Sequence, residues 1–85
     1  MPYRIIVSGI DNGKWVDICS FPSLTDKEGT EFQVCDTMST IQYKKQLNEF
    51  CELKTDTEEV FFDPNKFSAL RVRYYECETV NYNMN

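Results

Sequence analysis

The sequence predicts an α+β domain, with one amphipathic helix packed on one face of a small, mostly antiparallel sheet of four to five strands. Two β-rich segments, residues 3–9 and 15–21, flank Asn12 and Gly13. This dipeptide favours a tight hairpin, because both central residues of a type I′ turn need positive φ. Farther along the chain, apolar residues recur at helical spacing over residues 40–53. The hairpin and the separate helix together predict the fold class.

The second predicted strand carries apolar side chains on both of its faces. Trp15 and Cys19 lie on one face, whereas Val16 and Ile18 lie on the other. A strand of this kind is usually covered on both sides. We therefore expect Trp15 to belong to the core of the domain.

The segment after the first hairpin allows two interpretations. Gly29 weakens a helix by about 1 kcal/mol relative to alanine, and Phe32 and Val34 alternate as they would in a strand. We therefore expect a short turn at residues 24–28 and a strand at residues 30–35. A helix over the same residues is the alternative.

The predicted helix spans residues 40–53. Ser39 is its expected N-cap, because a glutamine three residues later completes a capping box. An apolar stripe then follows helical spacing and consists of Tyr43, Leu47, Phe50 and Cys51. We expect this stripe to lie on the sheet.

Two further strands complete the predicted sheet. The first covers residues 58–62, and Pro64 favours a turn directly after it. The second and longest covers residues 69–80. Its apolar residues change sides after Tyr74, which predicts a β-bulge near Tyr74 and Tyr75.

The chain is short and acidic. Its 85 residues form one domain, residues 1–85, with a formal net charge of −5 and a sequence pI near 4.6. Phosphate backbones and anionic membranes repel such a chain, so we expect neither nucleic acid nor a membrane as its main partner. The first apolar run is too short for a signal peptide, and no run approaches the roughly 18 apolar residues of a membrane span. These features predict a cytoplasmic protein.

The cysteines are isolated from one another along the chain. No Cys-x-x-Cys pair occurs among Cys19, Cys35, Cys51 and Cys77. Structural zinc sites usually bring their ligands in close pairs, so we expect no metal here. Free and mostly buried thiols are the favoured interpretation, and two disulfides are the alternative.

No catalytic constellation is visible in the sequence. The chain has no histidine, so a serine or cysteine nucleophile would lack its usual base. Phosphate-binding loops are also absent. Asp17 is the acid nearest to an apolar run, and we interpret it as a solvent-facing position on the second strand. We therefore predict that the protein is not an enzyme and needs no cofactor.

Acidic residues concentrate in one stretch that is relieved only by Lys54. An ordinary solvated surface would explain them, but a docking face for a basic protein surface is the functional alternative. The candidate protein-binding residues are Glu49, Glu52, Asp56, Glu58, Glu59 and Asp63.

A second candidate surface is basic and aromatic. Arg71, Arg73 and Tyr75 alternate on one face of the last strand, and Arg4 joins them if the first and last strands pair. Such a face could stack single-stranded nucleic acid. Because the chain is acidic overall, ion pairing of these arginines with acids such as Asp17 is the favoured interpretation.

The leading functional hypothesis is a small acidic protein-binding module without catalytic activity. Small viral inhibitors that occupy a nucleic-acid-gripping surface of a host protein often have this profile, although the comparison rests on general character alone. The alternatives are a single-stranded nucleic-acid binder and a structural homo-oligomer. A homodimer could form through an edge strand.

Overall fold

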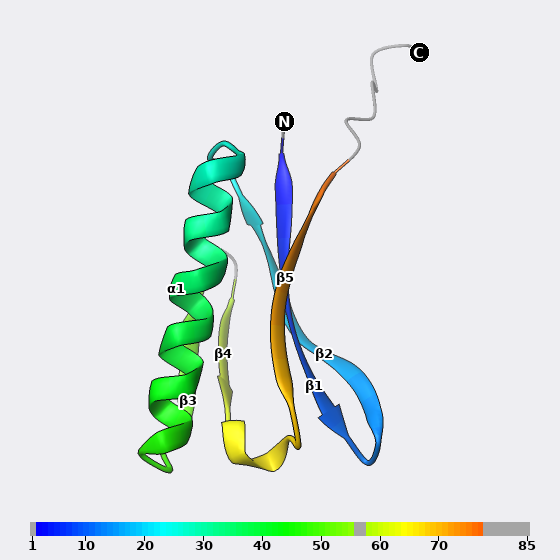
Figure 1. Ribbon diagram of the computed structural model, residues 1–85, viewed down its shortest axis with the longest axis vertical. Coiled ribbons are helices and arrows are strands. Elements are labelled where there is room, and N and C mark those ends of the chain that lie inside the picture. The colour runs from blue at the N-terminus through cyan, green and yellow to red at the C-terminus, as the bar shows by residue number, and fades with distance from the viewer. Residues whose placement is uncertain (1, 56–57, 78–85) are drawn as a thin grey trace.

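The computed structural model describes residues 2–55 and 58–77 (Figure 1). Five antiparallel strands form two small sheets, and one helix packs against the larger sheet, so the predicted α+β class is confirmed for these residues. In chain order the elements are β1 (Tyr3–Asp11), β2 (Lys14–Ser23), α1 (Lys27–Gln46), β3 (Cys51–Lys54), β4 (Glu59–Phe62), the 3₁₀ turn η1 (Pro64–Lys66) and β5 (Leu70–Glu76).

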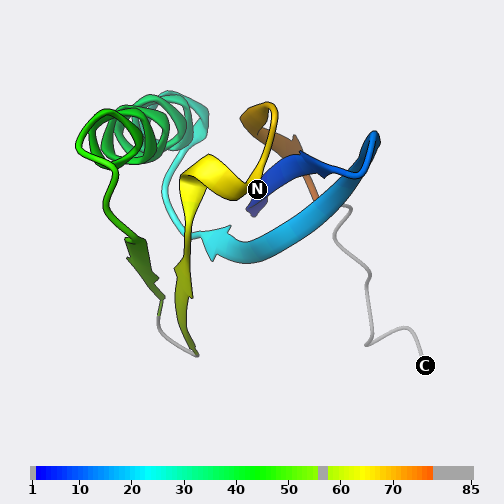
Figure 2. The same ribbon diagram turned by 90° about the horizontal axis from the view of Figure 1, so that it is seen from below.

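The larger sheet has the strand order β2-β1-β5, so the first strand lies in its centre. The turn between β1 and β2 is the predicted one, because Asn12 and Gly13 both have positive φ, 55° and 77°. The second sheet is the β3–β4 hairpin. Figures 1 and 2 place the three-stranded sheet on one side and α1 with this hairpin on the other.

The predictions for the middle of the chain are wrong. Residues 30–35 belong to α1 rather than to a strand, and the helix covers residues 27–46 rather than 40–53. It begins at Asp26, whose carboxylate accepts a hydrogen bond from the backbone N–H of Gly29 at 2.8 Å. A Cβ atom at Gly29 would collide with the side chain of Thr25, so glycine suits this first turn despite its low helix propensity.

The helix ends in a Schellman motif. Asn48 has a φ of 56°, and its N–H donates to the carbonyl of Lys45 at 3.1 Å. The N–H of Glu49 donates to the carbonyl of Lys44 at 3.0 Å. The predicted helix therefore extends beyond the observed end of α1, and residues 51–54 form β3 instead.

Most of the predicted apolar stripe faces away from the core. Three of its residues are exposed, namely Tyr43, Leu47 and Phe50, and the fourth, Cys51, is buried as part of β3. The residues that α1 itself buries are Thr30 and Ile41. The start of the helix is attached to the end of β2 by polar groups: the hydroxyls of Ser23 and Thr30 lie 2.8 Å apart, and Ser23 donates to Gln33 at 2.7 Å. Tyr74 also donates to Glu31 at 2.6 Å, which links β5 to the helix.

The β-bulge lies in β2 and not near Tyr74. Pairing between β1 and β5 is continuous, whereas the pairing of β1 with β2 shifts between Val7 and Ser8. The extra residue is Ile18, because Val7 pairs with Cys19 and Ser8 with Asp17. Cys19 therefore points into the core, while the earlier odd-numbered residues of β2, Trp15 among them, turn to the opposite face.

One core joins the two sheets and the helix. It consists of buried residues from β1, β2, α1, β3, β4 and the segment after η1, namely Val7, Cys19, Ile41, Cys51, Phe62 and Phe67. The predicted strand 58–62 corresponds closely to β4, and the predicted strand 69–80 to β5. Positions 78–80 of that prediction lie outside the described residues. All four cysteines are free thiols, of which Cys19 and Cys51 are buried and Cys35 is exposed.

Replacing Ile41 by alanine should lower the free energy of unfolding by about 2–5 kcal/mol, because this side chain is fully buried between α1 and both sheets. Phe32→Ala on the exposed side of the same helix should change it by less than about 0.5 kcal/mol. Urea unfolding followed by circular dichroism measures both. Equal losses in the two variants would contradict the orientation of α1.

The stability of the domain should fall in alkaline solution. Burial, with smaller contributions from the Glu58 carboxylate and Cys51, raises the pKa of the Cys19 thiol from 9.0 to about 11. Because the thiol loses its proton more easily in the unfolded chain, the contribution of Cys19 to stability is complete only below the pKa of the unfolded state. This contribution is lost as the pH rises from about 9 to 11. The difference in unfolding free energy between the wild type and Cys19→Ala should therefore shrink over this range. Parallel pH profiles would argue against a buried Cys19.

Candidate interaction surfaces

The structure divides the six predicted acidic residues. Glu52 and Glu59 lie on the outer face of the β3–β4 hairpin, where their neighbours across the strand pair are Phe61 and Lys54. Asp63 follows β4 and lines the same end of the hairpin. These three residues form the acidic part of one surface.

Two of the remaining predicted acids lie outside the strands of the hairpin, Glu49 before β3 and Glu58 before β4. Glu49 forms an ion pair with Lys44 at 3.3 Å, close to the end of α1. Glu58 is exposed in the turn before β4, where its backbone N–H donates to the hydroxyl of Thr55 at 3.1 Å. Asp56 lies outside the described residues. The structure therefore brings three of the predicted acids, Glu52, Glu59 and Asp63, to the outer face and the end of the hairpin.

Two stacked phenylalanines lie at the end of the hairpin where β3 begins and β4 ends. The rings of Phe50 and Phe61 lie 5.2 Å apart at an interplanar angle of 23°. They remain 52% and 67% exposed, although each has the other as a neighbour. Rings stacked in this way are held in a fixed orientation while most of their area stays in water. We call Phe50, Phe61, Glu52, Glu59 and Asp63 the hairpin surface.

A shallow cleft adjoins the two rings. It has a volume of about 580 Å³ and is lined by four phenylalanines together with one acid and one base, namely Phe50, Phe61, Phe62, Phe67, Asp63 and Lys66. Asp63 also caps η1, because its carboxylate accepts from the N–H of Asn65 at 2.9 Å. The cap fixes the position of this carboxylate at the edge of the cleft.

The sequence contains a signal for this surface in β4. Val60, Phe61 and Phe62 are consecutive apolar residues in a short strand, so the middle one must point away from the side of the other two. Helical spacing places Phe50 in the predicted stripe, whereas in the structure it follows the end of α1 and stacks on Phe61. The sequence pattern does not reveal that the helix ends before Asn48, and this end is what allows Phe50 to reach Phe61.

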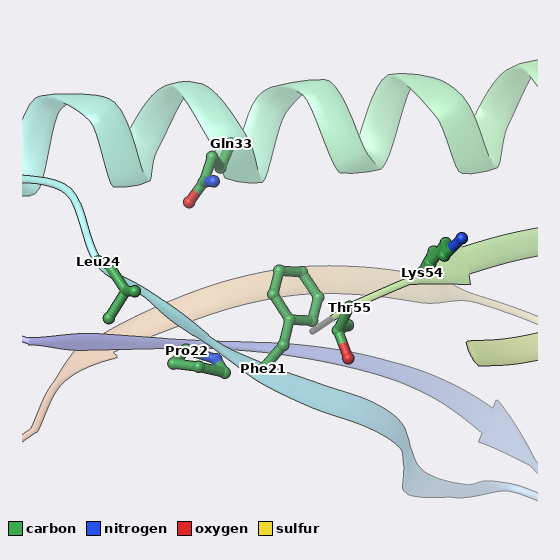
Figure 3. Close-up of a pocket in the computed structure, with 6 residues that line it drawn as sticks. All are labelled: Phe21, Pro22, Leu24, Gln33, Lys54 and Thr55. Carbon is green, nitrogen blue, oxygen red and sulfur yellow. The ribbon is translucent and has the colours of Figure 1, made fainter. Parts of the chain in front are cut away.

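A smaller pocket lies between the end of β2, α1 and the end of β3 (Figure 3). Its volume is about 280 Å³, and its lining residues are Phe21, Pro22, Leu24, Gln33, Lys54 and Thr55. The only ionisable side chain among them is Lys54, whose ammonium lies 3.7 Å from Glu59. This lining offers no acid–base pair for catalysis.

The basic and aromatic residues come together as predicted. Because β1 pairs with β5, Arg4 lies opposite Tyr75 and Arg73 lies opposite Ile6. Arg71 lies opposite Ser8 on the same face. This face is the one turned away from the core, since Ile5 and Val7 alternate with these positions and are fully buried.

The expected ion pairing with Asp17 is not observed. Asp17 accepts a hydrogen bond from the hydroxyl of Ser8 at 2.9 Å. In residues 2–55 and 58–77 the ion pairs are Lys44 with Glu49 and Lys54 with Glu59, and neither involves an arginine. Arg4 instead donates from Nε to the hydroxyl of Ser20 at 3.2 Å.

Comparison with protein-family models, with curated proteins and with solved structures finds no match to this chain. In the described part of the chain, no helix is both long and apolar enough to cross a membrane. No group of three or more Cys, Asp or Glu side chains there is placed to hold a metal ion.

Proposed function

We propose that the chain is a non-enzymatic protein-binding module that docks through the hairpin surface onto a basic surface of another protein. The observation that carries this proposal is the exposed stack of Phe50 on Phe61 beside carboxylates. Binding energy in protein interfaces concentrates in a few central side chains, and aromatic residues are enriched at such interfaces. A preformed stack loses little conformational freedom on binding, which favours affinity.

The carboxylates determine the kind of partner. Glu52, Glu59 and Asp63 lie around the rings, and Lys54 is the one base on the strands of this face. Rim charges of one sign speed the encounter with an oppositely charged surface and fix its orientation more than they add affinity. A protein surface that normally grips phosphate groups would supply lysines and arginines for this rim. Occupying such a surface is an inhibitory mode of action that requires no reaction.

Phe61→Ala should abolish capture of the partner, because it removes the more exposed of the two stacked rings. The immobilised chain is used to capture proteins from a host-cell lysate, and the captured protein is then produced and its affinity measured. Phe32→Ala, which removes a 72% exposed ring from α1, is the matched control and should bind like the wild type. A partner lost equally from both variants, or retained by Phe61→Ala, would rule out the hairpin surface.

Charge reversal at the rim should act mainly on the rate of association. We expect Glu52→Lys to slow association with the captured partner about tenfold at low salt, with the difference shrinking as salt rises. Asp36→Lys, at an exposed position of α1, introduces the same change of charge away from the hairpin surface and serves as the control. Surface plasmon resonance at two salt concentrations measures both rates. Identical association rates for the two variants would show that the acids do not guide docking.

A further inference from the structure

All the arginines of the chain lie on one face of the three-stranded sheet. Arg71 and Arg73 project from β5, and Arg4 projects from β1, on the side opposite the core. Lysines are absent from this face, although the sequence contains twice as many lysines as arginines. Arginine differs from lysine in having a planar group that both binds phosphate in a fork and stacks on rings. We call Arg4, Arg71, Arg73, Trp15 and Tyr75 the sheet surface.

The sheet surface is positive on a protein that is negative overall. Three guanidinium groups and the carboxylate of Asp17 give the strand residues of this face a formal charge of +2, against −5 for the chain. Asp17 is engaged by Ser8, and none of the arginines has an ion-pair partner among the described residues. At an ionic strength of 0.1 M, exposed charges act over about 10 Å. The field that a ligand meets here is therefore set mainly by the arginines.

Aromatic rings lie between these charges. The guanidinium carbon of Arg71 is 3.8 Å from the centre of the Trp15 ring. Its Nε has no hydrogen-bond partner among the described residues, so ring stacking takes the place of an ion pair in positioning this side chain. Trp15 remains 43% exposed and Tyr75 48% exposed. The face thus presents two accessible rings at opposite ends of a row of arginines.

We propose that the sheet surface binds single-stranded nucleic acid, with bases stacked on Trp15 and Tyr75 and phosphates contacted by Arg4 and Arg73. Single strands are recognised in this way, because unpaired bases expose π faces while a positive surface follows the backbone. A duplex keeps its bases stacked inside and would leave both rings without a partner. An acidic protein segment would satisfy the arginines but would make no specific use of the rings.

The proposal can be tested by fluorescence anisotropy with a labelled 15-nucleotide oligo-uridine and its DNA counterpart at 25 mM salt. Arg73→Glu should weaken binding at least tenfold and lower the slope of log K against log salt by about 0.7. Lys27→Glu makes the same change of charge at the exposed start of α1 and should alter binding less than twofold. No binding of either oligonucleotide, or equal losses in the two variants, would overturn the proposal.

The rings provide an independent test. Trp15→Ala should weaken binding about tenfold, which is typical of losing one stacked base. Tyr75→Ala should weaken oligonucleotide binding to a similar extent, and Tyr75 lies away from the contact between Arg71 and Trp15. This variant therefore tests the rings even if Trp15→Ala lowers stability. Phe61→Ala on the hairpin surface should bind the oligonucleotide like the wild type. The oligonucleotide test is therefore independent of the proposed protein partner. Tighter binding of a duplex, or competition by poly-glutamate as strong as by oligo-uridine, would show that the ligand class is wrong.

Discussion

The rest of the structure depends on the pairing of β1 with β2 on one side and with β5 on the other. This pairing brings Tyr3 opposite Glu76, so the two ends of the described chain are joined across the sheet. Ile5 and Val7 become fully buried as a result and form the centre of the sheet's inner face. The outer face is fixed by the same register, because side chains alternate along each strand. The position of every arginine thus follows from a contact between residues more than sixty positions apart.

The helix is held by a mixture of polar and apolar contacts. Ser23, Thr30 and Gln33 connect the end of β2 to the first turns of α1, and Ile41 provides the apolar anchor farther along. Buried hydroxyls that satisfy one another fix a specific position, because moving either one leaves an unpaired polar group. This arrangement explains why the helix does not need an apolar stripe toward the sheet and can leave Phe32 and Tyr43 in water.

The sequence allowed prediction of what depends on local chemistry. Asn12 and Gly13 determine the first hairpin, and strand alternation correctly grouped Arg71, Arg73 and Tyr75. The predicted helix is displaced from α1 because the apolar spacing of Tyr43, Leu47 and Phe50 does not mark a buried face. Periodicity shows that residues share a face, but tertiary packing decides whether that face is covered. The bulge at Ile18 likewise depends on pairing with the neighbouring strand. This bulge turns Trp15 to the exposed face. Glu49 forms an ion pair with Lys44 at the end of α1, a contact that depends on where the helix ends.

The β3–β4 hairpin has only two strands, and an isolated hairpin of that size is marginal in water. Its inner residues Cys51 and Phe62 belong to the same core as Val7 and Ile41, so hairpin and core are stabilised together. A molecule that holds the outer rings therefore holds the whole domain in its native form by mass action. Occupancy of Phe50 and Phe61 would accordingly appear as a higher melting temperature of the entire chain.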